Sequence, residues 1–205
     1  KLYKNLKRQG INAFVISCDC YYRTMPCGQD PARYNFDEPE ALELSLLAKH
    51  LRELRSGVVA RIPKYCFKTH QRTGDIEKIK EVDVILVEGI FALCDKEVRD
   101  QTDLKIYVQE ESDICLARRT LRDVKERGRQ AENVIMRYQK FVKPAYDRYI
   151  KPSSQHADVI IPVAGRNKAA TELIIRSILS YFKHNSGPCE DISAEFKTAE
   201  TKEEK

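Results

Sequence analysis

The sequence predicts an α/β fold in which a parallel sheet is covered by helices on both faces. Short, unbroken apolar segments alternate with longer amphipathic ones, and strands buried on both faces have this continuous apolar character. The chain has 205 residues, which is enough for one sizeable core. Two apolar segments lead into a carboxylate, Asp19 and Glu88. Because parallel sheets bind ligands at the carboxyl ends of their strands, these side chains predict a site.

The first three elements are predicted from apolar spacing. Residues 1–9 have a basic helical pattern, and Gly10 suits the end of that helix. The apolar run at 12–17 predicts a buried strand. In 40–55, leucines recur on one face, which predicts an amphipathic helix with a proline in its first turn and Asp37 as its N-cap.

The later elements continue the alternation of strands and helices. Residues 58–67 are rich in strand formers but contain a proline, which is typical of an edge strand or hairpin. A helix is predicted over 132–150, interrupted at Pro144. The other elements are strands at 82–89, 104–108 and 157–162, and helices at 112–127 and 168–183.

Charge and composition narrow the classes of partner. The chain carries a net charge of +5, but residues 185–205 hold six acids and three lysines, a net of −3, which leaves +8 on residues 1–184. We therefore expect one domain over 1–184 that binds anions, either nucleic acid or nucleotide phosphate, and a disordered polar tail. Seven scattered cysteines indicate reduced thiols, and no apolar run has the length of a membrane span, so we expect a cytoplasmic protein.

Two segments carry side chains suited to a nucleotide or nucleoside. Residues 116–129 contain five arginines and one lysine. Guanidinium groups are suited to phosphate oxygens, whereas lysine would serve equally well on a basic face that is only solvated. Tyr65 and Phe67 share one face of a strand near His70, an arrangement that suits a flat heterocycle. Taken alone, this second segment favours ordinary hairpin packing.

Together, these segments resemble the uridine kinase (uridine–cytidine kinase) family. The matching pieces are CDCYY, YNFDEPEA, IPKYCFKTHQR, ILVEGIFAL, VRD, DICLARRTLRDVKERGR, QKFVKPAY and ADVIIP, within roughly residues 1–183. The resemblance implies a P-loop nucleoside/nucleotide kinase fold with a small β-hairpin substrate lobe and an arginine-rich helical lid. It also implies phosphorylation of the 5′-hydroxyl of uridine or cytidine by ATP and Mg²⁺, which gives UMP or CMP in pyrimidine salvage.

The resemblance also implies roles for individual residues. Asp19 is similar to the family's catalytic carboxylate, Glu88 to its magnesium-side acid, and Arg122 and Arg127 to the lid arginines over the ATP phosphates. Asp37 and Arg119 match the ribose-binding positions, and Tyr65 and His70 match the base-binding positions. The full set of implied substrate-binding residues is Tyr22, Asp37, Tyr65, Phe67, His70, Arg119, Arg129 and Arg137.

The sequence departs from the family pattern in three places. No pair of glycines precedes Lys and Ser/Thr at P-loop spacing. We therefore expect the first strand and the P-loop to lie before Lys1 or to be lost, and the chain as given to be an inactive fragment. Arg137 stands where the family usually has a base-contacting glutamine, and Cys66 stands where aspartate is usual.

Other readings stay open at this point. The chain is alternatively a sister kinase of the phosphoribulokinase or pantothenate kinase type, or a non-catalytic homologue that binds a nucleoside or a kinase subunit. A nucleic-acid-binding module is disfavoured, because no platform of interleaved basic and aromatic residues is visible. The expected partners are uridine or cytidine and ATP, without nucleic acid or membrane. The resemblance implies a homo-oligomer, a tetramer.

Overall fold

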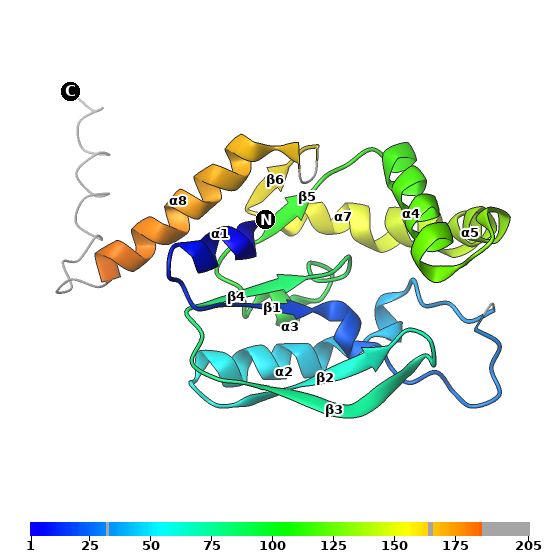
Figure 1. The fold of residues 1–205 in the computed structure, drawn as a ribbon, viewed down its shortest axis with the longest axis horizontal. Helices are drawn as coiled ribbons and strands as arrows, with labels where there is room; N and C mark the ends of the chain where they lie inside the picture. The colour runs from blue at the N-terminus through cyan, green and yellow to red at the C-terminus, as the bar shows by residue number, and fades with distance from the viewer. Residues whose placement is uncertain (32, 164–165, 186–205) are drawn as a thin grey trace. The chain divides into compact units, whose positions relative to one another are not determined.

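The computed structural model describes residues 1–31, 33–163 and 166–185 (Figure 1). Apart from Asn185, the tail predicted over 185–205 lies outside these residues. The described residues divide into two compact units: one comprises Lys1 and those between Tyr3 and Asn167, and the other comprises Leu2 and those from Lys168 onward. Helix α8 (Lys168–Asn185) belongs to the second unit, and the elements that position the candidate site all belong to the first.

Parallel strand pairs form the centre of the first unit. Strand β1 (Ala13–Ser17) pairs with β4 (Val84–Glu88), and β5 (Ile106–Val108) pairs with β6 (Val159–Ile161), both in parallel. The predicted parallel α/β architecture is confirmed. Among the described residues these are separate two-stranded ladders, and none joins β4 to β5.

An antiparallel hairpin follows helix α2 (Leu44–Arg55). Strands β2 (Ala60–Cys66) and β3 (Gln71–Ile79) pair with a register shift between Pro63 and Lys64, so the proline is tolerated at a bulge. The hairpin predicted from 58–67 is confirmed. Its second strand escaped prediction because β3 is charged and almost wholly exposed, and therefore lacks an apolar alternation.

Helix α2 (Leu44–Arg55) starts later than its sequence pattern predicts, and Figure 1 shows it running alongside the hairpin. A separate 3₁₀ turn spans Pro39–Ala41, and Leu42 is extended because it forms an isolated antiparallel bridge with Tyr22. The helix therefore begins only at Leu44, and Asp37 is not its N-cap. The predicted apolar face is confirmed, since Leu44, Leu47 and Leu51 are buried.

Short helices α1 (Leu2–Arg8) and α3 (Lys96–Arg99) bracket the β1–β4 region in sequence, and α3 is capped by the Asp95 carboxylate. Helix α4 (Ser112–Arg127) has the bounds predicted from the sequence and ends at Gly128, whose φ of 63° gives a left-handed C-terminal cap.

The helix predicted over 132–150 is not interrupted at Pro144. Helical segments follow one another without a break: α5 (Ala131–Arg137), π-helical residues Tyr138–Val142, α6 (Lys143–Ala145), π-helical residues Tyr146–Ile150 and α7 (Lys151–Ser153). Each π-helical segment leads directly into a short helix with a proline in its first turn. The wider turns accommodate residues that cannot donate a backbone hydrogen bond, so the helix continues.

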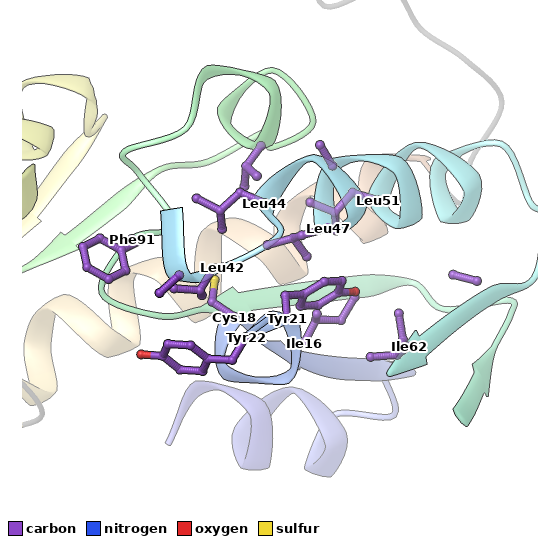
Figure 2. Packing of buried hydrophobic residues seen from close by; sticks show 14 of the residues in the cluster. Ile16, Cys18, Tyr21, Tyr22, Leu42, Leu44, Leu47, Leu51, Ile62 and Phe91 are labelled. Carbon is purple, nitrogen blue, oxygen red and sulfur yellow. The ribbon is translucent and has the colours of Figure 1, made fainter. Parts of the chain in front are cut away.

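The main core lies between β1, the hairpin and α2 (Figure 2). Tyr21 and Tyr22 follow each other in the chain, and Figure 2 shows their side chains pointing in different directions. Tyr21 is fully buried and its hydroxyl hydrogen-bonds to His50 Nδ1 of α2 at 3.0 Å. The core therefore holds the short 3₁₀ turn Cys18–Tyr21, directly after β1, in place.

Within the described residues, no helix combines the length and the apolar character that crossing a membrane requires. The six cysteines described there are free thiols, in agreement with the prediction of reduced cysteines.

Gly89 allows the ends of β1 and β4 to approach each other closely. A Cβ atom at this position would lie 2.5 Å from Cys18 Cβ and 2.7 Å from its Sγ, and the backbone φ is 155°. Cys18 is itself buried, at 1% exposure, so it has little freedom to move aside. Glycine is therefore required at the junction that brings Asp19 and Glu88 together.

We expect Gly89→Ala to lower the free energy of unfolding by about 2–4 kcal/mol, because overpacking against Cys18 adds to backbone strain. Gly74→Ala is the matched control, since a Cβ there would contact nothing within 4 Å and its φ is not positive. Urea unfolding of the two variants measures the difference. Equal stability of both variants would contradict the close approach at Gly89.

Candidate active site

Two carboxylates lie at the adjacent carboxyl ends of β1 and β4. Glu88 is the last residue of β4 and is paired in register with Ser17, the last residue of β1. Asp19 follows in the 3₁₀ turn, and its backbone N–H donates to Ser17 Oγ at 3.4 Å. The geometry that the sequence suggested for this edge is therefore present.

The pKa of Asp19 is raised above the ordinary aspartate value. The main cause is desolvation by the surrounding side chains, and the neighbouring charge of Glu88 adds to it, while Arg127 and Arg122 partly oppose the shift. The side chain still reaches solvent. Asp19 is thus an accessible carboxylate whose pKa responds to a second acid and to two arginines.

The same pair of carboxylates fits a magnesium ion. Mg²⁺ usually retains several waters and takes only one or two protein carboxylates together with substrate phosphates. The described residues contain no cluster of three or more acidic, histidine or cysteine side chains, which a protein-only cation site would need. The repulsion from Glu88, which adds to the desolvation that raises the pKa of Asp19, would be relieved by a divalent cation near both acids.

An aromatic cluster stands beside these carboxylates. The Tyr22 ring lies 5.4 Å from that of Tyr65 and 6.4 Å from that of Phe67, and Tyr65 and Phe67 are 5.3 Å apart. Phe36 stacks on His70 with centroids 4.7 Å apart. The structure therefore brings together residues that the sequence placed in three separate segments.

Phe36 and its neighbour Tyr34 were not predicted as site residues. Their rings are 4.6 Å apart, and Phe36 also packs edge-on against Tyr22 at 6.2 Å. The signal was available in the aromatic spacing just before Asp37. Burial, followed by the charges of Arg129 and Arg137, lowers the pKa of His70, which keeps its imidazole neutral near pH 7. A neutral imidazole can donate or accept a hydrogen bond.

Two buried polar atoms in this region have no hydrogen-bond partner among the described residues. They are the Tyr65 hydroxyl oxygen and Arg119 Nε. Arg119 faces the buried Asp37, with 3.9 Å between Nη1 and Oδ1. Burial raises the pKa of Asp37, against the lowering effect of Arg119. Buried polar groups are normally satisfied, so this pair of orphan atoms suggests a polar ligand.

A buried carboxylate of α4 gathers two arginines of this helix and one that follows it. Asp123 has no exposed surface, and its carboxylate lies 2.9 Å from Arg122, 3.3 Å from Arg127 and 3.1 Å from Arg129. The Arg127 guanidinium also lies 5.6 Å from the centre of the Phe67 ring, which brings the end of α4 to the hairpin. Three guanidinium groups therefore share one counter-charge and leave an excess of positive charge for an anion.

Sequence reasoning missed Asp123, because an acid inside a basic helix reads as an ordinary surface residue. Burial by itself would raise the pKa of Asp123, but the hydrogen bond and charge of Arg122, with Arg127 and Arg129, more than offset that effect. The net result is a pKa below the ordinary value, so Asp123 stays ionised at neutral pH.

Two other arginines point elsewhere. Arg118 pairs with Glu110 at 2.7 Å, away from the cluster. Arg137 donates to the backbone oxygens of Pro31 and Tyr34 at 3.2 and 3.3 Å, and its guanidinium lies over the Phe141 ring. These bonds tie Arg137 to the loop that carries the aromatic residues.

Comparison with known proteins now adds to the geometry. The sequence profile of the phosphoribulokinase/uridine kinase family matches residues 10–170. The chain belongs to this family. Its relatives include uridine-cytidine kinase B of Dictyostelium discoideum, at 45% identity over 81% of this chain and 69% of that protein. Uridine kinase of Clostridium novyi is 37% identical over 90% of this chain and 89% of its own.

Coverage of the relatives differs. Against uridine-cytidine kinase A of Dictyostelium discoideum, at 43% identity, the chain spans 33% of that protein's length.

Among solved structures, phosphoribulokinase from Rhodobacter spheroides gives a TM-score of 0.59 at 19% identity, covering 78% of this chain and 64% of that one. This likeness establishes the P-loop kinase fold. The phosphoribulokinase/uridine kinase family is a family of kinases, and this chain carries its kinase fold.

We expect Asp123→Asn to lower the free energy of unfolding at pH 7 by about 1–3 kcal/mol, since it leaves three partly exposed arginines without their counter-charge. The folded pKa of Asp123 is depressed. Its contribution is therefore present above the unfolded pKa of about 4 and disappears as pH falls through the folded pKa.

Urea unfolding from pH 7 to 3 measures this prediction. The stability gap between parent and variant should narrow on acidification, because all other titrating groups are shared. Glu126→Gln, an exposed carboxylate on the same helix, serves as the control and should change little. A gap that stays constant with pH would contradict the buried ionised pair.

Proposed function

We propose that this chain forms the nucleoside-binding and catalytic part of a uridine/cytidine kinase, which transfers the terminal phosphoryl group of ATP to the nucleoside 5′-hydroxyl. The observation that carries the proposal is an accessible carboxylate, Asp19, whose charge acts on Tyr22 and Tyr65 of the aromatic cluster and whose own pKa is lowered by Arg127 and Arg122 of the arginine cluster. One reactant would lie on each side of it. The named relatives support the same reading.

The aromatic side suits a pyrimidine nucleoside. The rings of Tyr65, Phe67 and His70 offer flat contacts for a base, and the neutral imidazole suits either uracil or cytosine. Asp37 and Arg119 offer an acceptor and donors for the ribose hydroxyls. Binding there would satisfy the Tyr65 hydroxyl and Arg119 Nε.

The arginine side suits the phosphates of ATP. Phosphoryl transfer passes through a loose transition state, so positioning and charge stabilisation dominate its catalysis. Arg122 and Arg127 would offset the negative charge spread over the transferring group, and Asp19 would orient the 5′-hydroxyl and accept its proton. Glu88 and Asp19 would hold Mg²⁺, which, when bound, supplies further charge neutralisation at the phosphates. A cytoplasmic site of action fits the free thiols.

Initial-rate assays of the protein expressed from its complete reading frame test the proposal with ATP and uridine, cytidine, adenosine or ribulose 5-phosphate. We expect turnover of the two pyrimidine nucleosides, and a loss of about 10²–10⁴ in kcat for Asp19→Asn. Uridine affinity of the variant should stay within about threefold, as expected of a catalytic role.

Asp75→Asn, an exposed carboxylate of β3, is the control and should behave like the parent. Turnover of ribulose 5-phosphate in place of the nucleosides would refute the substrate assignment. An Asp19→Asn enzyme that keeps most of its kcat would make Asp19 a turn residue only.

The arginines divide between the two substrates. The charge of Arg127 lowers the pKa of Asp19, whereas the charge of Arg129 lowers the pKa values of Asp37 and His70. We therefore expect Arg127→Ala to lower kcat by about 10²–10³, and Arg129→Ala to raise the nucleoside KM. Steady-state kinetics with ATP and uridine varied separately measure both effects.

Arg118→Ala is the matched control, because Arg118 lies on the same helix but pairs with Glu110. If Arg127→Ala and Arg129→Ala both behaved like Arg118→Ala, residues 118–129 would form only a solvated basic face. The assignment of Arg127 and Arg129 to the two substrates would then be wrong.

A further inference from the structure

Arg72 connects the hairpin to the turn that carries Asp19. It is the second residue of β3 and lies opposite Tyr65 in the hairpin register. Its Nε donates to the backbone oxygen of Tyr22 and its Nη2 donates to that of Tyr21, both at 3.0 Å. The third nitrogen, Nη1, pairs with Glu43 Oε2 at 2.8 Å.

The two carbonyls belong to the segment directly after Asp19. The Tyr21 oxygen also accepts the Glu43 backbone N–H at 2.9 Å, so the guanidinium and the start of α2 hold the same peptide. A second link lies close by, because Met25 N–H donates to the His70 oxygen at 3.0 Å. The turn, the hairpin tip and the start of α2 are thus joined around one arginine.

These bonds are partly shielded from water. The side chains of Arg72 and Glu43 are 24% and 32% exposed. Hydrogen bonds from a charged donor to a carbonyl are stronger than neutral ones, and a guanidinium reaches two adjacent acceptors and a carboxylate in one fixed geometry. A lysine in this place keeps the charge but cannot reproduce the fork.

We propose that Arg72 is a positioning residue for the nucleoside: it fixes the distance between the Asp19 carboxylate and the aromatic wall of the hairpin. This inference rests on the proposed function, in which the base contacts the hairpin and the 5′-hydroxyl faces Asp19. The positions of both ends of one substrate then depend on the connection that Arg72 makes. A displacement of about 1 Å between reacting groups can cost on the order of 10²-fold in rate.

The first test measures the connection itself, without any assay of activity. Hydrogen exchange followed by mass spectrometry compares the parent chain with Arg72→Lys and Glu43→Gln. In Arg72→Lys, peptides covering 18–25 and 64–72 should exchange at least about tenfold faster, because their shared bonds are weakened. The β1–β4 amides should be unchanged. In Glu43→Gln the two carbonyl bonds remain, so exchange should change by less than about threefold.

The second test measures positioning. Calorimetric titration of the same proteins with uridine should give a Kd about tenfold higher for Arg72→Lys and nearly the parent Kd for Glu43→Gln. In the complete protein, Arg72→Lys should raise the uridine KM and lower kcat together while the KM for ATP stays constant. A role that depends only on charge or general stability predicts that lysine restores the parent behaviour.

The outcomes distinguish a failure of the positioning role of Arg72 from a failure of the proposed function. Unchanged exchange in Arg72→Lys would overturn the connection. Faster exchange with an unchanged uridine Kd would overturn the positioning role alone. A parent chain that does not bind uridine would overturn the proposed function, and the inference with it, whatever the exchange data show.

Discussion

The close approach of Cys18 to Gly89 is the constraint on which the rest of the site depends. It lets the parallel strands β1 and β4 end side by side, with Ser17 and Glu88 in register. Asp19 lies in the short 3₁₀ turn that directly follows β1, and the burial of Cys18 and Tyr21 fixes the position of that turn. The position of the Asp19 carboxylate is thus a consequence of core packing.

Charge organises the other side of the site. The buried Asp123 draws together Arg122, Arg127 and Arg129, which would otherwise repel one another. The charge of Arg127 lowers the pKa of Asp19, and its guanidinium lies over the ring of Phe67. The arginine cluster shares one counter-charge, Asp123, and is not neutralised by Asp19. It therefore keeps an excess of positive charge, which a phosphate-binding surface requires.

Much of this arrangement could be predicted from the sequence, because it rests on local patterns. Apolar strands ending near Asp19 and Glu88, the leucine face of α2 and the bounds of α4 all follow from spacing and residue type. Asp37 was wrongly assigned as a helix cap, because the Tyr22–Leu42 bridge that delays α2 is a contact between distant segments. The buried state of Asp123 likewise depends on tertiary structure, whereas the continuous helix through Pro144 rests on π-helical turns that apolar spacing does not reveal. The role of Arg72 is of the same kind, since its partners lie about fifty positions away.

The central claim is that a pyrimidine nucleoside binds between the hairpin and Asp19. A crystal structure of the chain with uridine tests it most directly. The account predicts the base against Tyr65 and Phe67, new hydrogen bonds to the Tyr65 hydroxyl and Arg119 Nε, and the 5′-hydroxyl within hydrogen-bond distance of Asp19. Uridine bound elsewhere, with those two polar atoms still without a partner, would contradict it.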